Sequence, residues 1–142
     1  MMRRYGLIGR PLGHSASAVY FAKKFRKEGI TDCRYDLYEL PSIDALPELL
    51  RRTPDLCGLN VTIPYKREVV PLLNELSFEA SAVGAVNCIR RTADGRLTGH
   101  NTDIIGLRAA LDELLGAEQP ERALVLGTGG ASQAVQYVLA ER

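Results

Sequence analysis

The first sixty residues alternate between the patterns of strands and helices, and this order restricts the fold more than any other feature. Apolar segments typical of strands cover Tyr5–Gly9, Cys33–Leu40 and Leu56–Thr62. Between them, Ala18–Glu28 and Ser42–Arg52 carry apolar residues near helical spacing. Such an order favours parallel pairing with right-handed crossovers. The sequence therefore predicts an α/β fold with a mostly parallel sheet, in which the third strand is buried on both faces.

The middle of the chain predicts irregular structure and then a hairpin. Lys66–Leu76 and Phe78–Val83 are expected to be helical or irregular. Ala85–Arg91 and Arg96–Gly99 flank the turn residues Thr92-Ala93-Asp94-Gly95, as in a β-hairpin.

The C-terminal part resembles the start of a dinucleotide-binding unit. We expect a helix over Ile104–Leu115, a strand over Ala123–Leu126 and a helix over Ala131–Ala140. Glycines between a strand and a helix let the backbone approach a pyrophosphate, which the helix N-terminus favours. An ordinary tight turn is the alternative interpretation. The candidate phosphate-binding residues are Gly127, Thr128, Gly129, Gly130 and Ala131.

Composition argues against several classes of protein. The chain has 142 residues, 46% of them hydrophobic and 25% charged, which is ordinary for a globular domain. A net charge of +1 disfavours nucleic acids and membrane surfaces as partners, and no apolar run is long enough to span a bilayer. Cys33, Cys57 and Cys88 form no CxxC pair, so we expect free thiols in a reducing cytoplasm, with neither a disulfide framework nor a metal site.

Lys66 is a candidate catalytic residue because of its place after the third strand. Pro64 blocks extension of that strand, and Lys66 then begins a helix. Side chains just past the carboxyl end of a parallel strand face the crevice where α/β sheets bind ligands. A lysine there can exchange a proton with a substrate oxygen. The alternative is a solvated surface lysine.

Two further segments carry candidate polar residues. Ser15 and Ser17 follow the first strand at a helix start, where hydroxyls suit an anion, although Ser17 could serve only as a helix cap. Asn101-Thr102-Asp103 precedes an apolar helix, so helix capping is again the simpler interpretation. We expect only a structural role for His14.

Four blocks of sequence, in this order, are similar to the shikimate dehydrogenase family. The resemblance implies that Lys66 and Asp103 are catalytic, and that both also bind substrate together with Ser15, Ser17, Thr62 and Asn87. It implies that the glycine loop binds NADP. Two positions depart from common patterns: Ala18 stands where the family usually has proline, and Ser132 replaces the third glycine of GxGxxG. The blocks are Asn60–Lys66, Gly84–Asn87, Asn101–Asp103 and Gly127–Ser132.

The resemblance implies an organisation and a reaction. We expect a three-layer substrate-binding domain over residues 1–103, followed over 104–142 by a linking helix and an incomplete Rossmann-like unit. The implied reaction is NADPH-dependent reversible reduction of 3-dehydroshikimate to shikimate in aromatic amino-acid biosynthesis, in the cytoplasm, and the family allows a homodimer. A quinate/shikimate paralogue and a non-catalytic substrate-binding module are the alternatives. We expect this chain alone to have no useful turnover, and its residues 123–142 to dock elsewhere, pair with another copy or fray.

Overall fold

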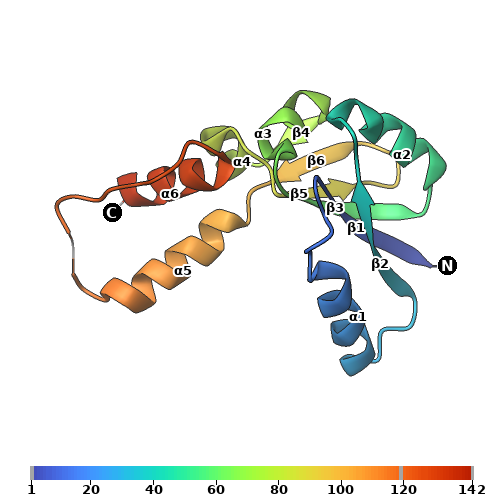
Figure 1. The fold of residues 1–142 in the computed structure, drawn as a ribbon, viewed down its shortest axis with the longest axis horizontal. Helices are drawn as coiled ribbons and strands as arrows, with labels where there is room; N and C mark the ends of the chain where they lie inside the picture. The colour runs from blue at the N-terminus through green and yellow to red at the C-terminus, as the bar shows by residue number, and fades with distance from the viewer. Residues whose placement is uncertain (1, 119, 142) are drawn as a thin grey trace.

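The computed structural model describes residues 2–118 and 120–141. At its centre is a six-stranded sheet with the order β2-β1-β3-β5-β6-β4 (Figure 1). The strands are β1 Arg3–Gly9, β2 Cys33–Glu39, β3 Leu56–Val61, β4 Glu75–Leu76, β5 Cys88–Arg91 and β6 Leu97–His100.

Strand pairing confirms the order expected from the alternating patterns. β1 lies between β2 and β3 and is parallel to both. β5 is antiparallel to β3 and to β6, so β5 and β6 form the predicted hairpin. The two-residue strand β4, which pairs parallel with β6, lies in a region for which only helical or irregular structure was expected.

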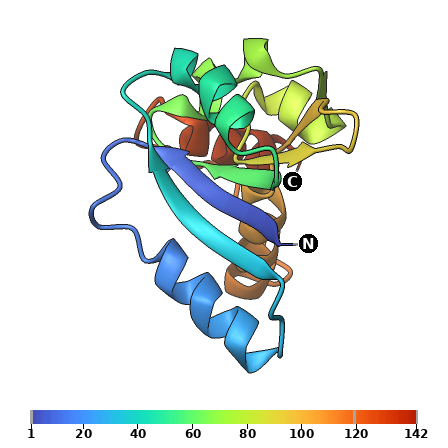
Figure 2. The same cartoon turned by 90° about the vertical axis from the view of Figure 1, so that its right-hand side faces the viewer.

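Helices cover the two faces of the sheet unequally. Helices α2 and α3 lie on one face and α1 on the other (Figures 1 and 2). The predicted helices at Ala18–Glu28, Ile104–Leu115 and Ala131–Ala140 are present with small shifts of their ends. The helix predicted at Ser42–Arg52 divides into a 3-10 turn and α2, and Phe78–Val83, expected to be helical or irregular, is helical. The observed helices are α1 Ser17–Lys27, α2 Leu46–Arg52, α3 Tyr65–Glu68, α4 Phe78–Val83, α5 Asp103–Leu115 and α6 Gly130–Ala140, with short 3-10 turns at Ile43–Ala45 and Val70–Leu72.

The main core lies on the α2 and α3 face. Ile8, Leu46, Leu56 and Val69 are almost wholly buried there. On the other face, Phe21 and Phe25 of α1 cover only part of the sheet. The expectation that β3 is buried on both faces is therefore wrong in part, because Cys57 and Asn60 are only half-buried on the less covered side.

The C-terminal helices form a second, smaller cluster. Ala134 and Val138 of α6 pack against Val83, Ala85 and Ile104, so α6 rests on α4 and α5. The strand expected at Ala123–Leu126 is absent: this segment is irregular. A strand needs a neighbour to pair with, and no described strand lies beside this segment. Residues 130–140 instead dock on helices, one of the outcomes expected for the tail.

Candidate active site

The sheet register gathers the candidate residues at one edge. β3 ends at Val61, and the start of antiparallel β5, Cys88, lies beside Asn60. Cys88 in turn faces His100, the last residue of β6. Segments that follow β3, precede β5 and follow β6 therefore meet at this edge. They carry Thr62 and Lys66, Asn87, and Thr102 and Asp103.

Lys66 and Asp103 meet there as an ion pair. Lys66 Nζ donates a hydrogen bond to Asp103 Oδ2 at 2.6 Å, across a separation of 37 residues. The side chains of Lys66 and Asp103 are 17% and 35% exposed, so the pair is partly buried but still accessible to a ligand. An ammonium group has three donors, so Lys66 can bond Asp103 and also approach a ligand oxygen.

Asn87 holds the other side of Asp103. Its Nδ2 donates to Asp103 Oδ1 at 2.8 Å and to Thr102 Oγ1 at 2.9 Å, and its Oδ1 accepts from Thr102 N at 2.8 Å. Its backbone is fixed as well, because Val61 N donates to Asn87 O and Asn87 N donates to His100 O. Gly84, with φ +68°, ends α4 in the left-handed region and turns the chain towards this position.

Helix capping at Asn101-Thr102-Asp103 differs from the expected form. Thr102 occupies the N-cap position of α5, but its side chain caps no backbone group. Asn101, only 4% exposed, accepts from Ile104 N at 3.4 Å and donates Nδ2 to Ala85 O at 3.0 Å. Asn101 therefore ties the start of α5 to the segment before Asn87, and Asp103 is left for Lys66 and Asn87.

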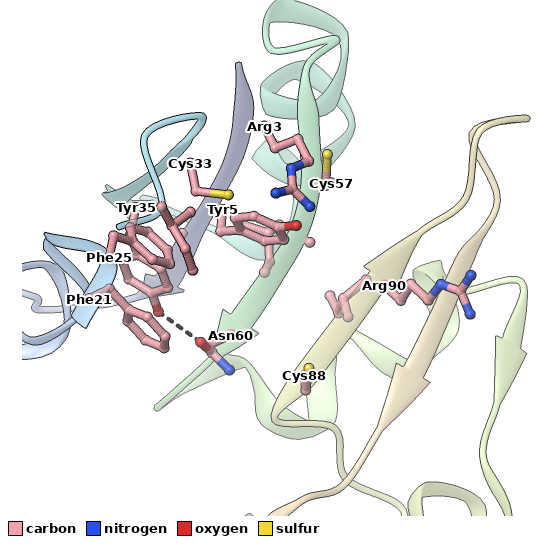
Figure 3. A pocket seen from close by; sticks show the side chains of 15 residues that line it. Arg3, Tyr5, Phe21, Phe25, Cys33, Tyr35, Cys57, Asn60, Cys88 and Arg90 are labelled. Atoms are coloured by element: carbon pink, nitrogen blue, oxygen red, sulfur yellow. Dashed lines mark hydrogen bonds between the residues drawn. The ribbon is translucent and has the colours of Figure 1, made fainter. Parts of the chain in front are cut away.

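The loop that carries Ser15 and Ser17, here called the serine loop, is linked to this edge through Tyr35 and Asn60. Sequence reasoning did not identify these two as site residues. The N-cap of α1 is Ala16, not Ser17, and Ser15 Oγ accepts from Ser17 N at 3.3 Å. Tyr35 Oη donates to Asn60 Oδ1 at 2.8 Å (Figure 3). Burial raises the pKa of Tyr35 to about 12, against a smaller lowering by the Ser17 hydroxyl beside it. An asparagine within an otherwise apolar strand was the available signal for Asn60.

Thr62 begins the turn that leads to Lys66. Its backbone nitrogen donates to Ile8 O at 2.9 Å, and its carbonyl accepts from Tyr65 N at 3.0 Å. Gly9, at the end of β1, leaves room for the Thr62 methyl group, because a side chain there would lie 2.4 Å from Thr62 Cγ2. Thr62 is half-buried beside the Lys66 turn.

The glycine loop fits a phosphate group. Gly127 has φ +118°, a conformation that favours glycine, and the N-cap Gly129 has no side chain to occupy the free amides of α6. No atom lies within 4 Å of where a Cβ of Gly129 would be, so a ligand can approach the backbone. Thr128 completes the loop, and Ala131 lies in the first turn of α6. This loop would account for only the phosphate part of a dinucleotide site.

A groove of about 420 Å³ lies on the less covered face of the sheet and shares Tyr35 and Asn60 with the site (Figure 3). Phe21, Phe25 and Tyr35 line it, together with all three cysteines, while Lys66 and Asp103 do not. Within residues 2–118 and 120–141, no three His, Cys, Asp or Glu side chains cluster as metal ligands. The helices of the same residues include none with the length and apolarity needed to cross a membrane.

Comparison with known proteins identifies the family. Residues 7–89, which include Ser15, Ser17, Thr62, Lys66 and Asn87, match the family described as "Shikimate dehydrogenase substrate binding domain". This chain belongs to that family.

Relatives and solved structures extend the similarity beyond the family match. Over 137 residues the chain is 46% identical to "Shikimate dehydrogenase (NADP(+))" of Syntrophomonas wolfei, covering 95% of this chain and 46% of that protein. It superposes on shikimate 5-dehydrogenase from Thermus thermophilus in complex with shikimate, with a TM-score of 0.84, 36% identity, and coverage of 99% and 53%. For a shikimate dehydrogenase in complex with NADP+ the TM-score is 0.85, at 36% identity and with coverage of 99% and 48%. The chain spans about half the length of these relatives.

Proposed function

We propose that this chain provides the substrate-binding and proton-transfer half of an NADP-dependent shikimate dehydrogenase. The observation that carries the proposal is the Lys66–Asp103 pair, held by Asn87 at the sheet edge where α/β folds bind ligands. Family membership and the names of the relatives support the proposed reaction, the reversible reduction of 3-dehydroshikimate to shikimate.

Substrate would be held from two sides of this edge. We assign the carboxylate to the hydroxyls of Ser15 and Ser17, since hydroxyl donors near a helix start suit an anion. We assign ring oxygens to Thr62, Lys66, Asn87 and Asp103. The hydrogen bonds of Asn60 with Tyr35 and Asn87 O support this arrangement, because the Ser17 hydroxyl lies beside Tyr35 and the three contacts together link the serine loop to the Lys66 side.

In reduction, Lys66 would give a proton to the ketone oxygen of the substrate. Asp103 and Asn87 would orient the ammonium group and keep it aimed at that oxygen. NADPH, when bound, would supply the hydride to the carbon of that ketone. The product alcohol then carries one hydrogen on carbon, from the hydride, and one on oxygen, from Lys66.

We propose that Gly127, Thr128, Gly129, Gly130 and Ala131 hold the NADP phosphates at the N-terminus of α6. We further propose a boundary between residues 103 and 104, with a substrate-binding domain before it and the start of the cofactor domain after it. A cytoplasmic location and a homodimer remain proposals from the family alone.

The substrate assignment is tested by titrating shikimate into the isotopically labelled 142-residue chain and following amide signals by NMR. Shifts centred on Ser15, Ser17, Asn87 and Asp103 are expected, and they should persist with modestly weaker binding in Lys66→Ala, whereas Ser15→Ala should weaken binding clearly. Binding of quinate in a parallel titration would favour the quinate/shikimate paralogue. Turnover is tested in a chimera that joins residues 1–142 to the remaining part of the Syntrophomonas wolfei relative. A chimera that binds shikimate but has no dehydrogenase activity would favour the non-catalytic module.

A further inference from the structure

The first turn of α6 lies directly against the side chain of Lys66. A methyl group at Gly130 would be 3.2 Å from Lys66 Cβ, 3.3 Å from Ala85 Cβ and 3.5 Å from Lys66 Cδ. The neighbouring Gly129 has no atom within 4 Å of the same position. The glycine loop and the candidate proton donor are therefore in contact at Gly130.

The atoms facing Gly130 cannot yield easily. Two of them are Cβ atoms, which move only with their backbone. Lys66 O accepts from Val86 N at 2.7 Å, and the carbonyl of the fully buried Ala85 accepts from Asn101 Nδ2. On the α6 side of the contact, Ala134 and Val138 hold the helix in the core cluster. A methyl group at Gly130 would have to displace either α6 or Lys66.

We infer that Gly130 is a positioning residue for Lys66. Because Gly130 lacks a side chain, the start of α6 can rest on the aliphatic stem of Lys66, so that the glycine loop and the Lys66–Asp103 pair are placed together. The catalytic meaning of this contact rests on the proposed function, but the contact itself does not. A ligand that orders the glycine loop would thereby also restrict Lys66.

Helix propensity alone predicts the opposite effect of substitution. Alanine is favoured over glycine within a helix, and it reduces the entropy of the unfolded chain. Without the Lys66 contact, Gly130→Ala should leave Lys66 unchanged and stabilise α6. Gly106, exposed in α5 with no atom within 4 Å of an added Cβ, offers a matched control.

The experiment follows the Lys66 side chain by NMR in the 142-residue chain with ¹³C- and ¹⁵N-labelled lysine, using Lys66→Ala for assignment. In Gly130→Ala we expect displaced Lys66 signals, loss of the slowly exchanging ammonium signal of the Asp103 pair, and shikimate binding weakened about fivefold or more. Gly106→Ala should change neither the Lys66 signals nor binding, and Gly129→Ala should leave the Lys66 signals in place. Unchanged Lys66 signals in Gly130→Ala would overturn the inference.

A second variant keeps the test decisive if Gly130→Ala folds poorly. The double substitution Gly130→Ala with Ala85→Gly moves the methyl group from one side of the contact to the other. This change relieves the contact with Ala85 Cβ but not the contact with Lys66 Cβ, so Lys66 signals that stay displaced support the inference. Full recovery of the Lys66 signals would show that only Ala85 opposed the methyl group, and would overturn it. The signals are read without ligand, so an unsubstituted chain that binds no shikimate would count against the proposed function only.

Discussion

The sheet edge around Lys66 and the segment that leads to the glycine loop differ in how their backbones are held. At the edge, buried Asn101 donates a hydrogen bond to Ala85 O, Val86 N donates to Lys66 O, and Asn87 N donates to His100 O. In the segment, Leu124 and Leu126 are each 85% exposed, and no described strand pairs with them. The difference teaches that strand-forming residues acquire a fixed place only when a neighbour satisfies their backbone groups.

Substituting leucines in the two regions should give the largest contrast. Leu46 in α2 is 1% exposed, so Leu46→Ala should lower the unfolding free energy of the protein by about 2–5 kcal/mol, because burial is lost and a cavity is left. Leu124→Ala should change it by less than about 0.5 kcal/mol, as at other exposed positions. Urea denaturation followed by circular dichroism measures both. A loss at Leu124 close to that at Leu46 would show that the segment is packed.

Removing the Lys66 amine should be the most severe change to catalysis at the sheet edge. In the chimera with the Syntrophomonas wolfei relative, Lys66→Ala should lower kcat about 100-fold or more, the scale of general acid–base help. KM for shikimate should change less, since Ser15, Ser17, Thr62 and Asn87 remain. Steady-state kinetics of shikimate oxidation measures both constants.

Two variants sharpen that result. Asp103→Asn keeps the shape of the side chain but removes its charge, and should also lower kcat. Ser15→Ala should instead mainly raise KM, because a ground-state contact is lost. Lys23→Ala, on the exposed side of α1, is the matched surface control. Normal kcat with raised KM in Lys66→Ala would make Lys66 a substrate clamp and not the proton donor.

Asn101→Ala tests whether the sheet edge and α5 are joined through one side chain. The change leaves Ala85 O and Ile104 N without their partner, which should cost about 1–3 kcal/mol of unfolding free energy. Thermal and urea unfolding measure the loss. In NMR spectra, the signals of Asp103 and Lys66 should shift together. A stable variant with unchanged signals would show that α5 is placed by other contacts.

The far end of α6 should respond weakly to pH. Arg108 on α5 pairs with Glu141 at 2.5 Å and, mainly through this hydrogen bond, holds the pKa of Glu141 below its usual range. A lowered folded pKa means that the contribution is complete above the unfolded glutamate pKa, about 4.3. It is lost as pH falls through the folded value. The protection of α6 amides against hydrogen exchange, measured relative to the intrinsic rate at each pH, should therefore fall slightly in that acidic window, and Arg108→Gln should abolish the change.

Sequence patterns predicted the elements that carry a local period or turn signal of their own. The strands and helices before Val61 and the hairpin of β5 and β6 follow from local periodicity and turn residues. β4 escaped prediction because two residues carry no period, and it exists through its pairing with β6. The strand at Ala123–Leu126 was wrong because propensity does not supply a partner strand.

For the site, the sequence supplied residue types but not their meeting. Lys66 and Asp103 are far apart in the chain, and only the register of β3, β5 and β6 brings them together. The resemblance to a known family named both in advance, whereas Tyr35 had no local signal that set it apart. Asn101 lay in a segment expected to cap a helix, but no local pattern indicated its bond to Ala85 O. The hydrogen bonds of Tyr35 and Asn101 depend on which strands and helices pack together.

The groove on the less covered face of the sheet carries its own chemical reporters. Cys33, Cys57 and Cys88 come from three different strands, all are half-buried free thiols, and all line this groove. Burial raises the pKa of the Cys33 and Cys88 thiols, so alkylation at neutral pH should be slow and should quicken in alkali. The rate of thiol labelling therefore measures access to this face, and any molecule that comes to cover it would silence three sites at once.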